Sequence, residues 1–312
     1  MTRAIIFGGN GFIGSHLAER LVTQGYEVKI FGLFSNGTSN LASIIDDVEL
    51  IRGDFMNKED LSTAMKNVDY VFHYISTTTP ITAVKNPIFD VESNIIGSIR
   101  LFQTASENNI EKIIFPSSGG TIYGEIKKDH IKETNPLNPV NPYAISKLTI
   151  EKYLHYYKHS FGVDYVILRY SNPYGERQNP LGNQGVIPIF LNKIKNKERP
   201  VIYGNGSAIR DYIYISDAID ATMAVLNSCT EETIFNVGSG QETSLNQLVD
   251  IMSEVTGHSI NPLYVENSGI YLPRIVLDIS RILKETGWCP RTGIKEGIHK
   301  TWKWINELSS VT

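Results

Sequence analysis

Two side chains suited to proton transfer, Tyr143 and Lys147, stand four positions apart near the middle of the chain. Asn141 is a good N-cap residue and Pro142 a good first helical residue, so a helix is predicted to begin here. Residues four apart share one face of a helix. Lowering a tyrosine pKa from about 10 to 7 requires ~4 kcal/mol, which an ammonium at about 4 Å supplies at an effective dielectric near 20. The pair could exchange the proton of a sugar or alcohol hydroxyl during hydride transfer.

The hydride carrier has a predicted site at the start of the chain. A short apolar run from Ala4 to Phe7 leads through a glycine cluster into a helical pattern, Gly25 ends that helix, and a second strand follows from Glu27 to Phe31. Such a unit of about thirty residues is a βαβ motif. Its glycines fit the dinucleotide-binding fingerprint, in which backbone and helix N-terminus receive a pyrophosphate: Gly8, Gly9, Gly11 and Gly14.

Further strands and helices alternate along the first two thirds of the chain, which predicts an α/β fold with a doubly wound parallel sheet. Ligands of such sheets bind beyond the carboxyl ends of the strands. The additional strands are expected at Glu49 to Arg52, Tyr70 to Tyr74, Lys112 to Phe115 and Tyr165 to Arg169, and the helices at Asp60 to Lys66 and Val91 to Glu107.

Beyond Gly175 the sequence becomes rich in Pro, Asn and Gly, with shorter helical patterns. We therefore expect a Rossmann-type dinucleotide-binding domain over residues 1–172, with a return segment near 210–240, and a smaller mixed domain over 173–312. The expected elements after Gly175 are helices at Gly185 to Lys195, Leu245 to Thr256 and Ile294 to Leu308, and strands at Tyr212 to Ile215 and Ile234 to Val237.

Composition excludes several classes of protein. The formal charge of −4 comes from scattered acids and bases, so neither nucleic acid nor an anionic membrane surface is an expected partner. Cys229 and Cys289 are far apart and lack metal-ligand spacing, which indicates free thiols and no metal site. No signal peptide or spanning helix is evident, so a soluble, cytoplasmic protein is expected.

The motifs together resemble the extended short-chain dehydrogenase/reductases, and among them the nucleotide-sugar epimerases and dehydratases. The resemblance covers Ala4 to Trp304 and rests on the glycine turn, Tyr143-x-x-x-Lys147, Arg169 to Gly175, Val201 to Gly206, and Arg210-Asp211-Tyr212. It implies a Rossmann domain holding NAD(P), a C-terminal domain holding a nucleoside-diphosphate sugar, and a homodimer formed through helices near Asn94 to Glu107 and Tyr143 to His159. It also implies a role in supplying sugars for polysaccharide biosynthesis.

The resemblance assigns roles to individual residues. Tyr143 becomes the acid/base, Lys147 its tuner and a ribose ligand, and Asp54 lies beside the adenine. The remaining implied cofactor contacts are Gly8, Gly11, Phe12, Ile13, Gly14, Phe55, Ile75, Ser76, Ser117 and Tyr170. The implied substrate contacts are Asn172, Arg177, Tyr203, Arg210 and Arg274. Arg210 could grip a phosphate bidentately, although a salt bridge to Asp211 is an alternative.

Three positions depart from the family pattern. Gly32 replaces the acid that usually binds the adenosine ribose, so NADP is possible beside NAD, yet no arginine appears nearby among the residues up to Asn40. Gly119 replaces the catalytic Ser or Thr, leaving Ser118 or Thr121 as the hydroxyl donor. We favour Ser118 because it follows a strand directly. Ser268 replaces an arginine that often grips the diphosphate.

Gly120-Thr121 occupies the place of the Asp-Glu pair that dehydratases of the family carry, which argues against dehydration. The leading prediction is C4 epimerisation of a nucleotide sugar, a UDP-sugar by preference, through a transient 4-keto intermediate. The alternatives are an NAD(P)H-dependent 4-ketoreductase of a 4-keto-6-deoxy sugar and a catalytically silent dinucleotide-binding scaffold. His73, at a strand end, is predicted to be a buried and satisfied structural residue rather than a base.

Overall fold

A computed structural model describes residues 1–35, 37–126, 130–266 and 272–308. Asn36 and Ser268 therefore lie outside the described residues. The chain forms two compact units. Unit 1 comprises residues 1–122, 139–169 and 231–235, and unit 2 comprises residues 123–138, 170–230 and 236–312.

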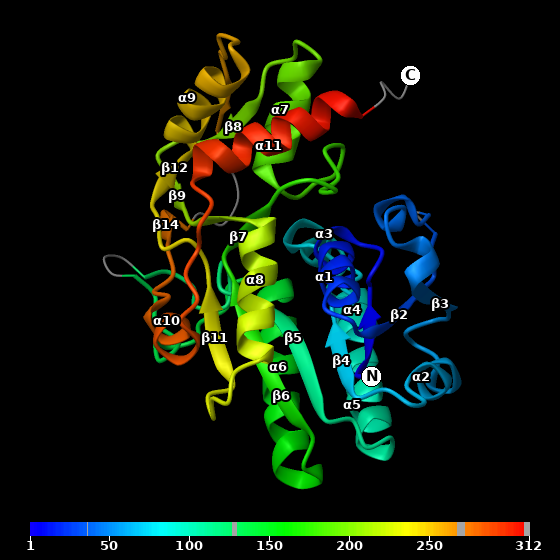
Figure 1. Ribbon diagram of the computed structural model, residues 1–312. Helices are drawn as coiled ribbons and strands as arrows, with labels where there is room; N and C mark the ends of the chain where they lie inside the picture. Colours follow the sequence, from blue (N-terminus) through cyan, green and yellow to red (C-terminus); the bar gives the residue numbers. More distant parts are fainter. Residues whose placement is uncertain (36, 127–129, 267–271, 309–312) are drawn as a thin grey trace. The chain divides into compact units, whose positions relative to one another are not determined.

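A seven-stranded sheet forms the framework of unit 1, in the order β11-β6-β5-β4-β1-β2-β3. β1 lies between β2 and β4, and the pairs β1–β2, β2–β3, β1–β4 and β4–β5 are parallel. This is the predicted doubly wound arrangement (Figure 1). The strands are β1 (Arg3–Phe7), β2 (Glu27–Gly32), β3 (Val48–Arg52), β4 (Tyr70–His73), β5 (Lys112–Ser118), β6 (Asp164–Tyr170) and β11 (Ile234–Val237).

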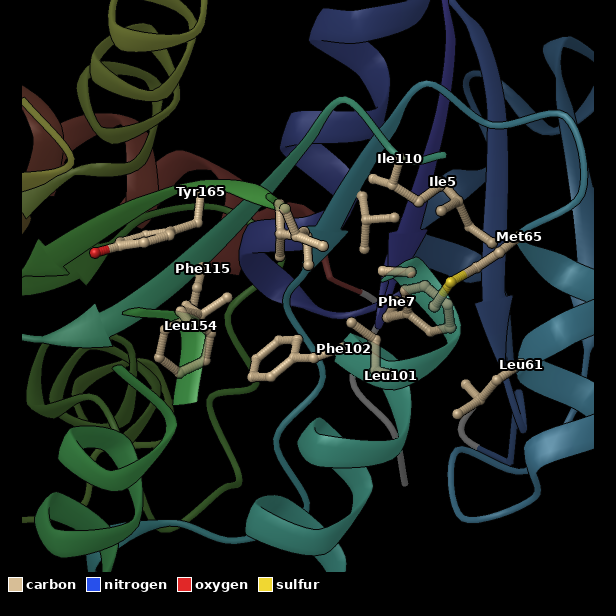
Figure 2. Close-up of a cluster of buried hydrophobic side chains, with 14 of the residues drawn as sticks. Ile5, Phe7, Leu61, Met65, Leu101, Phe102, Ile110, Phe115, Leu154 and Tyr165 are labelled. Carbon is tan, nitrogen blue, oxygen red and sulfur yellow. The ribbon is translucent and has the colours of Figure 1, made fainter. Parts of the chain in front are cut away.

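One face of this sheet is closed by a cluster of apolar side chains (Figure 2). Phe7 and Phe115 come from strands, and Leu61, Phe102 and Leu154 come from three helices, all of them nearly inaccessible to solvent. Burial of such a side chain stabilises the fold by about 1.5–3 kcal/mol. The helices of unit 1 are α1 (Phe12–Thr23), α2 (Lys58–Ala64), α3 (Pro80–Lys85), α4 (Pro87–Asp90), α5 (Gly97–Glu107) and α6 (Pro142–Phe161), with 3₁₀ turns at Ser39–Leu41 and Ile45–Asp47.

The helix expected from Val91 to Glu107 is more complex than predicted. Its first part, Val91–Ile96, is a π-helix that continues α4, and α5 begins only at Gly97. π-Helical turns are rare and occur frequently at functional sites. This turn carries Asn94, which lines the pocket described below.

Unit 2 is built from short strands and five helices among its described residues. Its strands are β7 (Asn172–Tyr174), β8 (Val201–Tyr203), β9 (Ile209–Arg210), β10 (Tyr212–Tyr214), β12 (Thr243–Ser244), β13 (Leu263–Val265) and β14 (Arg274–Ile275). Its helices are α7 (Val186–Lys195), α8 (Ile215–Leu226), α9 (Leu245–Thr256), α10 (Ser280–Thr286) and α11 (Ile294–Glu307).

Two predictions for this part of the chain need correction. The strand expected from Tyr212 to Ile215 ends at Tyr214, because Ile215 is the first residue of α8. The chain was also expected to return to the dinucleotide-binding domain near Arg210. The strand that follows Arg210, β10, pairs instead with β7 in a two-stranded sheet, and the strand at Ile234–Val237 joins the large sheet. The helix α8 was not predicted, because its stretch follows a strand without Gly or Pro to mark the change of periodicity.

Candidate active site

The glycine turn between β1 and α1 is shaped for close approach of a ligand. Gly8 has φ of 82°, and a Cβ there would lie 2.9 Å from the Ile75 backbone. A Cβ on Gly14 would collide with the Gly8 carbonyl oxygen. Gly11 is the N-cap of α1, and neither a side-chain cap nor an acidic residue occupies the first helical turn. The free N–H groups of this helix end therefore fit a pyrophosphate.

The adenosine end predicted for the same ligand lies at the carboxyl ends of β2 and β3. Asn10 Nδ2 donates to the Gly37 carbonyl at 3.1 Å, and Asn40 Nδ2 donates to the Asn10 carbonyl at 3.1 Å. These amides tie the glycine turn to the loop after β2. Asp54 is exposed and accepts from the Met56 N–H, whereas the Phe55 ring is buried in the core. The Phe55 side chain is therefore part of the core and is not available to a cofactor.

Tyr143 and Lys147 lie on the first turns of α6, as predicted, and line one pocket together with Ile75 and Ser76. Lys147 Nζ lies 5.7 Å from the centroid of the Tyr143 ring and 4.7 Å from that of Phe115. The same nitrogen donates to the Pro116 carbonyl at 3.0 Å. The structure therefore brings together four of the residues predicted for catalysis and cofactor binding.

The pKa of Tyr143 does not follow the sequence prediction. Burial raises the pKa of this phenol to about 12, and the Asp90 carboxylate adds to the rise. Burial lowers the pKa of Lys147 to about 8, against the attraction of Asp90 and Glu151. Desolvation of the Tyr143 phenolate thus raises its pKa by more than the Lys147 ammonium lowers it. That ammonium is hydrogen-bonded to the Pro116 carbonyl. A second positive charge beside the ring, such as that of an oxidised nicotinamide, would lower the pKa of the phenol.

A buried carboxylate that the sequence analysis missed lies beneath this pair. Asp90, at the end of α4, is fully buried and accepts hydrogen bonds from Thr78 Oγ1, Ser146 Oγ and, at 3.0 Å, Asn94 Nδ2. Ser146 directly precedes Lys147 on α6. Asp90 therefore ties α4 and the π-helical turn to the first turns of α6, and its charge acts on both Tyr143 and Lys147.

Replacing Asp90 with Asn is expected to shift the alkaline limb of the rate profile to lower pH. Lys147 must carry its proton to act on the phenol, and the rate should fall as the pH rises through its pKa of about 8. Because Asp90 raises the pKa of Lys147, removing this charge lowers it. The check is kcat/KM between pH 6 and 10, with the exposed Asp46→Asn as control. An unchanged limb in the Asp90 variant would contradict the role of this carboxylate.

Ser118, the hydroxyl donor predicted at the end of β5, is hydrogen-bonded to Thr121, the alternative donor. Thr121 Oγ1 donates to Ser118 Oγ at 2.9 Å. Because Ser118 Oγ accepts from Thr121, its own proton is directed elsewhere and can be donated to a substrate oxygen. Ser117, one position earlier, is buried, and its hydroxyl has no hydrogen-bond partner among the described residues. Ser118 as the hydroxyl donor stays a prediction, in which Thr121 would orient the Ser118 hydroxyl through this hydrogen bond.

Ser118→Ala is expected to lower kcat by about 100-fold, since loss of one preorganised donor typically costs 10²–10³. Thr121→Val should cost less than about tenfold, because it removes only the group that orients Ser118. The two effects should not add in the double variant, because the residues share one hydrogen bond. Steady-state rates of the three variants provide the check. A loss confined to the threonine variant would reverse the assignment.

His73 is buried, as predicted, but is only partly satisfied. Its Nε2 lies 2.7 Å from Ser98 Oγ, and Ser98 in turn donates to the Asn94 carbonyl. Nε2 must therefore carry the proton, and Nδ1 is left without a hydrogen-bond partner among the described residues. Burial, with the charge of Lys147, lowers the pKa of His73 to about 3. A neutral, buried imidazole of this kind is structural rather than a catalytic base.

Unit 2 holds the residues predicted to bind the substrate. Asn172 Nδ2 and N both donate to the Asp211 carbonyl oxygen, at 2.8 and 3.1 Å. The Asp211 carboxylate does not act as the salt-bridge partner considered for Arg210. It accepts instead from the N–H groups of Ser239, Gly240 and Leu277 and from the Ser239 hydroxyl. Burial raises the pKa of Asp211 against these donors. The carboxylate thus fixes the backbone from which Arg210 and Asn172 extend.

The other predicted substrate contacts differ in their surroundings. Arg274 pairs with Glu242, and Arg210 Nη1 donates to the Ile209 carbonyl at 2.8 Å. Arg210 lies on β9, between β12 and β14. The Tyr203 side chain is exposed, and Arg177 adopts a positive φ of 65°. The hydroxyl of Tyr170, which was predicted to contact the cofactor, lies 2.5 Å from Thr222 Oγ1.

Within the described ranges, no helix is both long and apolar enough to span a bilayer. In the same part of the chain, no group of three or more His, Cys, Asp or Glu side chains is placed to hold a metal ion.

A Rossmann sheet, a glycine turn at a helix N-terminus and a tyrosine–lysine pair on α6 define a dinucleotide-dependent enzyme of the short-chain dehydrogenase/reductase type. The chain belongs to the NAD-dependent epimerase/dehydratase family, whose model matches residues 4–238.

Relatives of the chain are similar to it over nearly their whole length. It is 37% identical over 302 residues to a putative UDP-glucose 4-epimerase of Methanocaldococcus jannaschii, covering 96% of this chain and 97% of the relative. It is 34% identical over 313 residues to a dTDP-4-dehydro-6-deoxyglucose reductase of Escherichia coli, covering 96% of each. The crystal structure of a Thermotoga maritima UDP-glucose 4-epimerase with UDP-glucose superposes with a TM-score of 0.93 at 31% identity, covering 98% and 99% of the two chains.

Proposed function

We propose that the chain interconverts the C4 epimers of a nucleoside-diphosphate sugar, by preference a UDP-sugar, through a transient 4-keto intermediate. The observation that carries this proposal is the Tyr143–Lys147 pair facing a pocket beside the glycine turn, in a chain of this family. The related chains named as UDP-glucose 4-epimerases support the same reaction.

The chain's own residues supply the proton chemistry. NAD, when bound, serves as acceptor of the C4 hydride and then as its donor to the opposite face. Tyr143 removes the proton of the C4 hydroxyl as the hydride leaves and returns it when the hydride comes back. The Ser118 hydroxyl donates to the sugar oxygen, and the Lys147 ammonium favours the phenolate. None of these steps needs the extra acid and base required to remove water.

Each unit has a proposed ligand. Unit 1 binds the dinucleotide through the glycine turn, Ile75 and Ser76, with Lys147 on the ribose. Unit 2 binds the sugar nucleotide, with Asn172 and Arg210 on the diphosphate and with Tyr203 and Arg177 as further contacts. The expected dinucleotide domain was residues 1–172 with a return segment near 210–240, whereas residues 123–138 and 170–172 belong to unit 2 and the return to unit 1 is limited to 231–235.

The identity of the dinucleotide bears on a second candidate function. Gly32 leaves no carboxylate at the end of β2, which lowers discrimination against NADP and favours an NAD(P)H-dependent 4-ketoreductase. The similarity to a 4-keto sugar reductase supports this alternative. We favour NAD and epimerisation because the family is NAD-dependent and an epimerase regenerates its cofactor in each cycle.

We also propose a homodimer that forms through two helical segments of each subunit, one near residues 94–107 and one near residues 143–159. Large apolar side chains are exposed on α6 and on the α4 and π-helical segment that packs beside it: Ile88, Phe89, Val91, Ile96, Ile145, Tyr156 and Phe161. Monomers seldom expose so many apolar groups on neighbouring elements. Sedimentation velocity of the parent and of Ile145→Glu would test the dimer.

The exposed Cys229 and Cys289 are free thiols, in keeping with a reducing cytoplasm.

The proposal is tested by the small molecules that the purified protein releases when denatured. Mass spectrometry is expected to show NAD, and the sugar nucleotide added beforehand should remain bound through gel filtration. A protein that releases no dinucleotide, and binds none in a titration, would contradict the proposal.

A further inference from the structure

The carboxyl end of β2 has space beside the glycine turn. A Cβ on Gly32, the last residue of β2, would lie 3.5 Å from Asn10 Oδ1, an ordinary contact, and 3.9 Å from Phe34. No acidic residue occurs between Gly32 and Asn40. In dinucleotide-binding sheets this is the place where an acid bonds the adenosine ribose and where a 2′-phosphate would otherwise lie.

The strand register places an arginine next to this space. β2 and β3 are parallel, and Gly32 is paired with Arg52, the last residue of β3. Neighbouring strands lie about 4.8 Å apart, and paired residues extend from the same face of the sheet. The pair Lys29 and Glu49 in this ladder follows the rule, with an ion pair of 3.8 Å. Arg52 therefore extends on the face where Gly32 borders Asn10 of the glycine turn.

The guanidinium of Arg52 is available to a ligand. Its side chain is exposed, and it makes no hydrogen bond or ion pair with another residue in the described ranges. Other arginines of unit 1 are occupied: Arg3 pairs with Asp69, Arg100 donates to the Met56 carbonyl, and Arg169 pairs with Glu151. A guanidinium without a partner at the edge of a dinucleotide site is suited to bidentate binding of a phosphate.

We infer that Arg52 is a binding residue for the 2′-phosphate of NADP(H), and that with Gly32 it makes the adenosine site accept the phosphorylated dinucleotide in addition to NAD. The inference rests on the proposed dinucleotide function of unit 1. Arg52 is not among the residues from Gly32 to Asn40, which contain no arginine, and it comes beside Gly32 only through the pairing of β2 with β3.

The test uses binding rather than turnover. The protein, freed of bound dinucleotide, is titrated with 2′,5′-ADP and with ADP by calorimetry, because these probes differ in the 2′-phosphate. Arg52→Ala is expected to weaken 2′,5′-ADP by about 10- to 100-fold, the effect of losing charge-assisted hydrogen bonds, and ADP by less than about twofold. Lys66→Ala removes an exposed charge elsewhere in unit 1 and should change neither. Gly32→Asp should weaken 2′,5′-ADP and leave ADP binding intact or tighter.

Other results would separate the inference on Arg52 from the proposed dinucleotide function. An equal loss for both probes in Arg52→Ala, or no loss for 2′,5′-ADP, would overturn the inference and leave the dinucleotide site standing. If the parent bound neither 2′,5′-ADP nor ADP, the proposed dinucleotide function would be overturned and this inference with it. Preserved thermal unfolding of each variant shows that the comparison is made on folded protein.

Discussion

Tyr143→Phe is expected to lower kcat by 10²–10⁴-fold, the usual contribution of a general acid–base group. Of the α6 side chains described as lining the pocket, Ser146 donates to Asp90 and Lys147 to the Pro116 carbonyl, whereas the Tyr143 phenol is left to exchange the proton of the C4 hydroxyl. Lys147 Nζ lies 5.7 Å from the centroid of its ring. Dinucleotide affinity should stay within a few fold, because the variant keeps the ring and removes only the hydroxyl. The measurements are steady-state kcat with a sugar nucleotide and Kd for NAD.

Tyr153→Phe is the matched control, since it makes the same change on the same helix, outside the lining of the pocket. Its activity should equal that of the parent. If Tyr143→Phe kept activity within about tenfold of the parent, Tyr143 would not be the acid/base, and another group would have to be sought in the pocket.

Arg169→Met is expected to lower the free energy of unfolding by about 3–5 kcal/mol, because it leaves a buried carboxylate without its partner. Arg169 on β6 and Glu151 on α6 are almost fully buried and joined by two hydrogen bonds, of 2.6 and 3.1 Å. Glu151 lies one turn after Lys147 and raises the pKa of that residue. Urea unfolding, followed by the fluorescence of the protein, measures the loss.

The double variant Glu151→Leu with Arg169→Met provides the control. Replacing a whole buried pair by apolar residues is often neutral or stabilising, so the double variant should recover most of the lost stability. If it were as unstable as Arg169→Met alone, the cost would come from packing rather than from the unpaired charge. The surface pair Lys193–Glu198, by contrast, should contribute less than about 1 kcal/mol.

The sequence predicted the fold because the relevant signals are local. The glycine turn, the strand before it and the capped start of α6 each lie within a dozen residues, and Asn141 accepts from the Ala144 N–H as its N-cap role requires. The alternation of strands and helices then allows few topologies. Those signals also placed Tyr143 and Lys147 on the same helix face.

What the sequence could not show depends on contacts between distant segments. Asp90 meets Ser146 across 56 positions, and nothing in its own surroundings marks it as part of the site. Arg52 lies beside Gly32 only through strand register, 20 positions away. The rise in the Tyr143 pKa depends on burial, which spacing along a helix does not reveal.

The most direct test of the proposed epimerase function is incubation with a panel of UDP-sugars without added cofactor, analysed by NMR. We expect each accepted sugar, UDP-glucose among them, to convert to a mixture with its C4 epimer, whichever of the two is supplied. Conversion should stop in Tyr143→Phe. If no UDP-sugar changed, and turnover required stoichiometric NADPH together with a 4-keto sugar nucleotide, the chain would be a reductase and the epimerase proposal would be wrong.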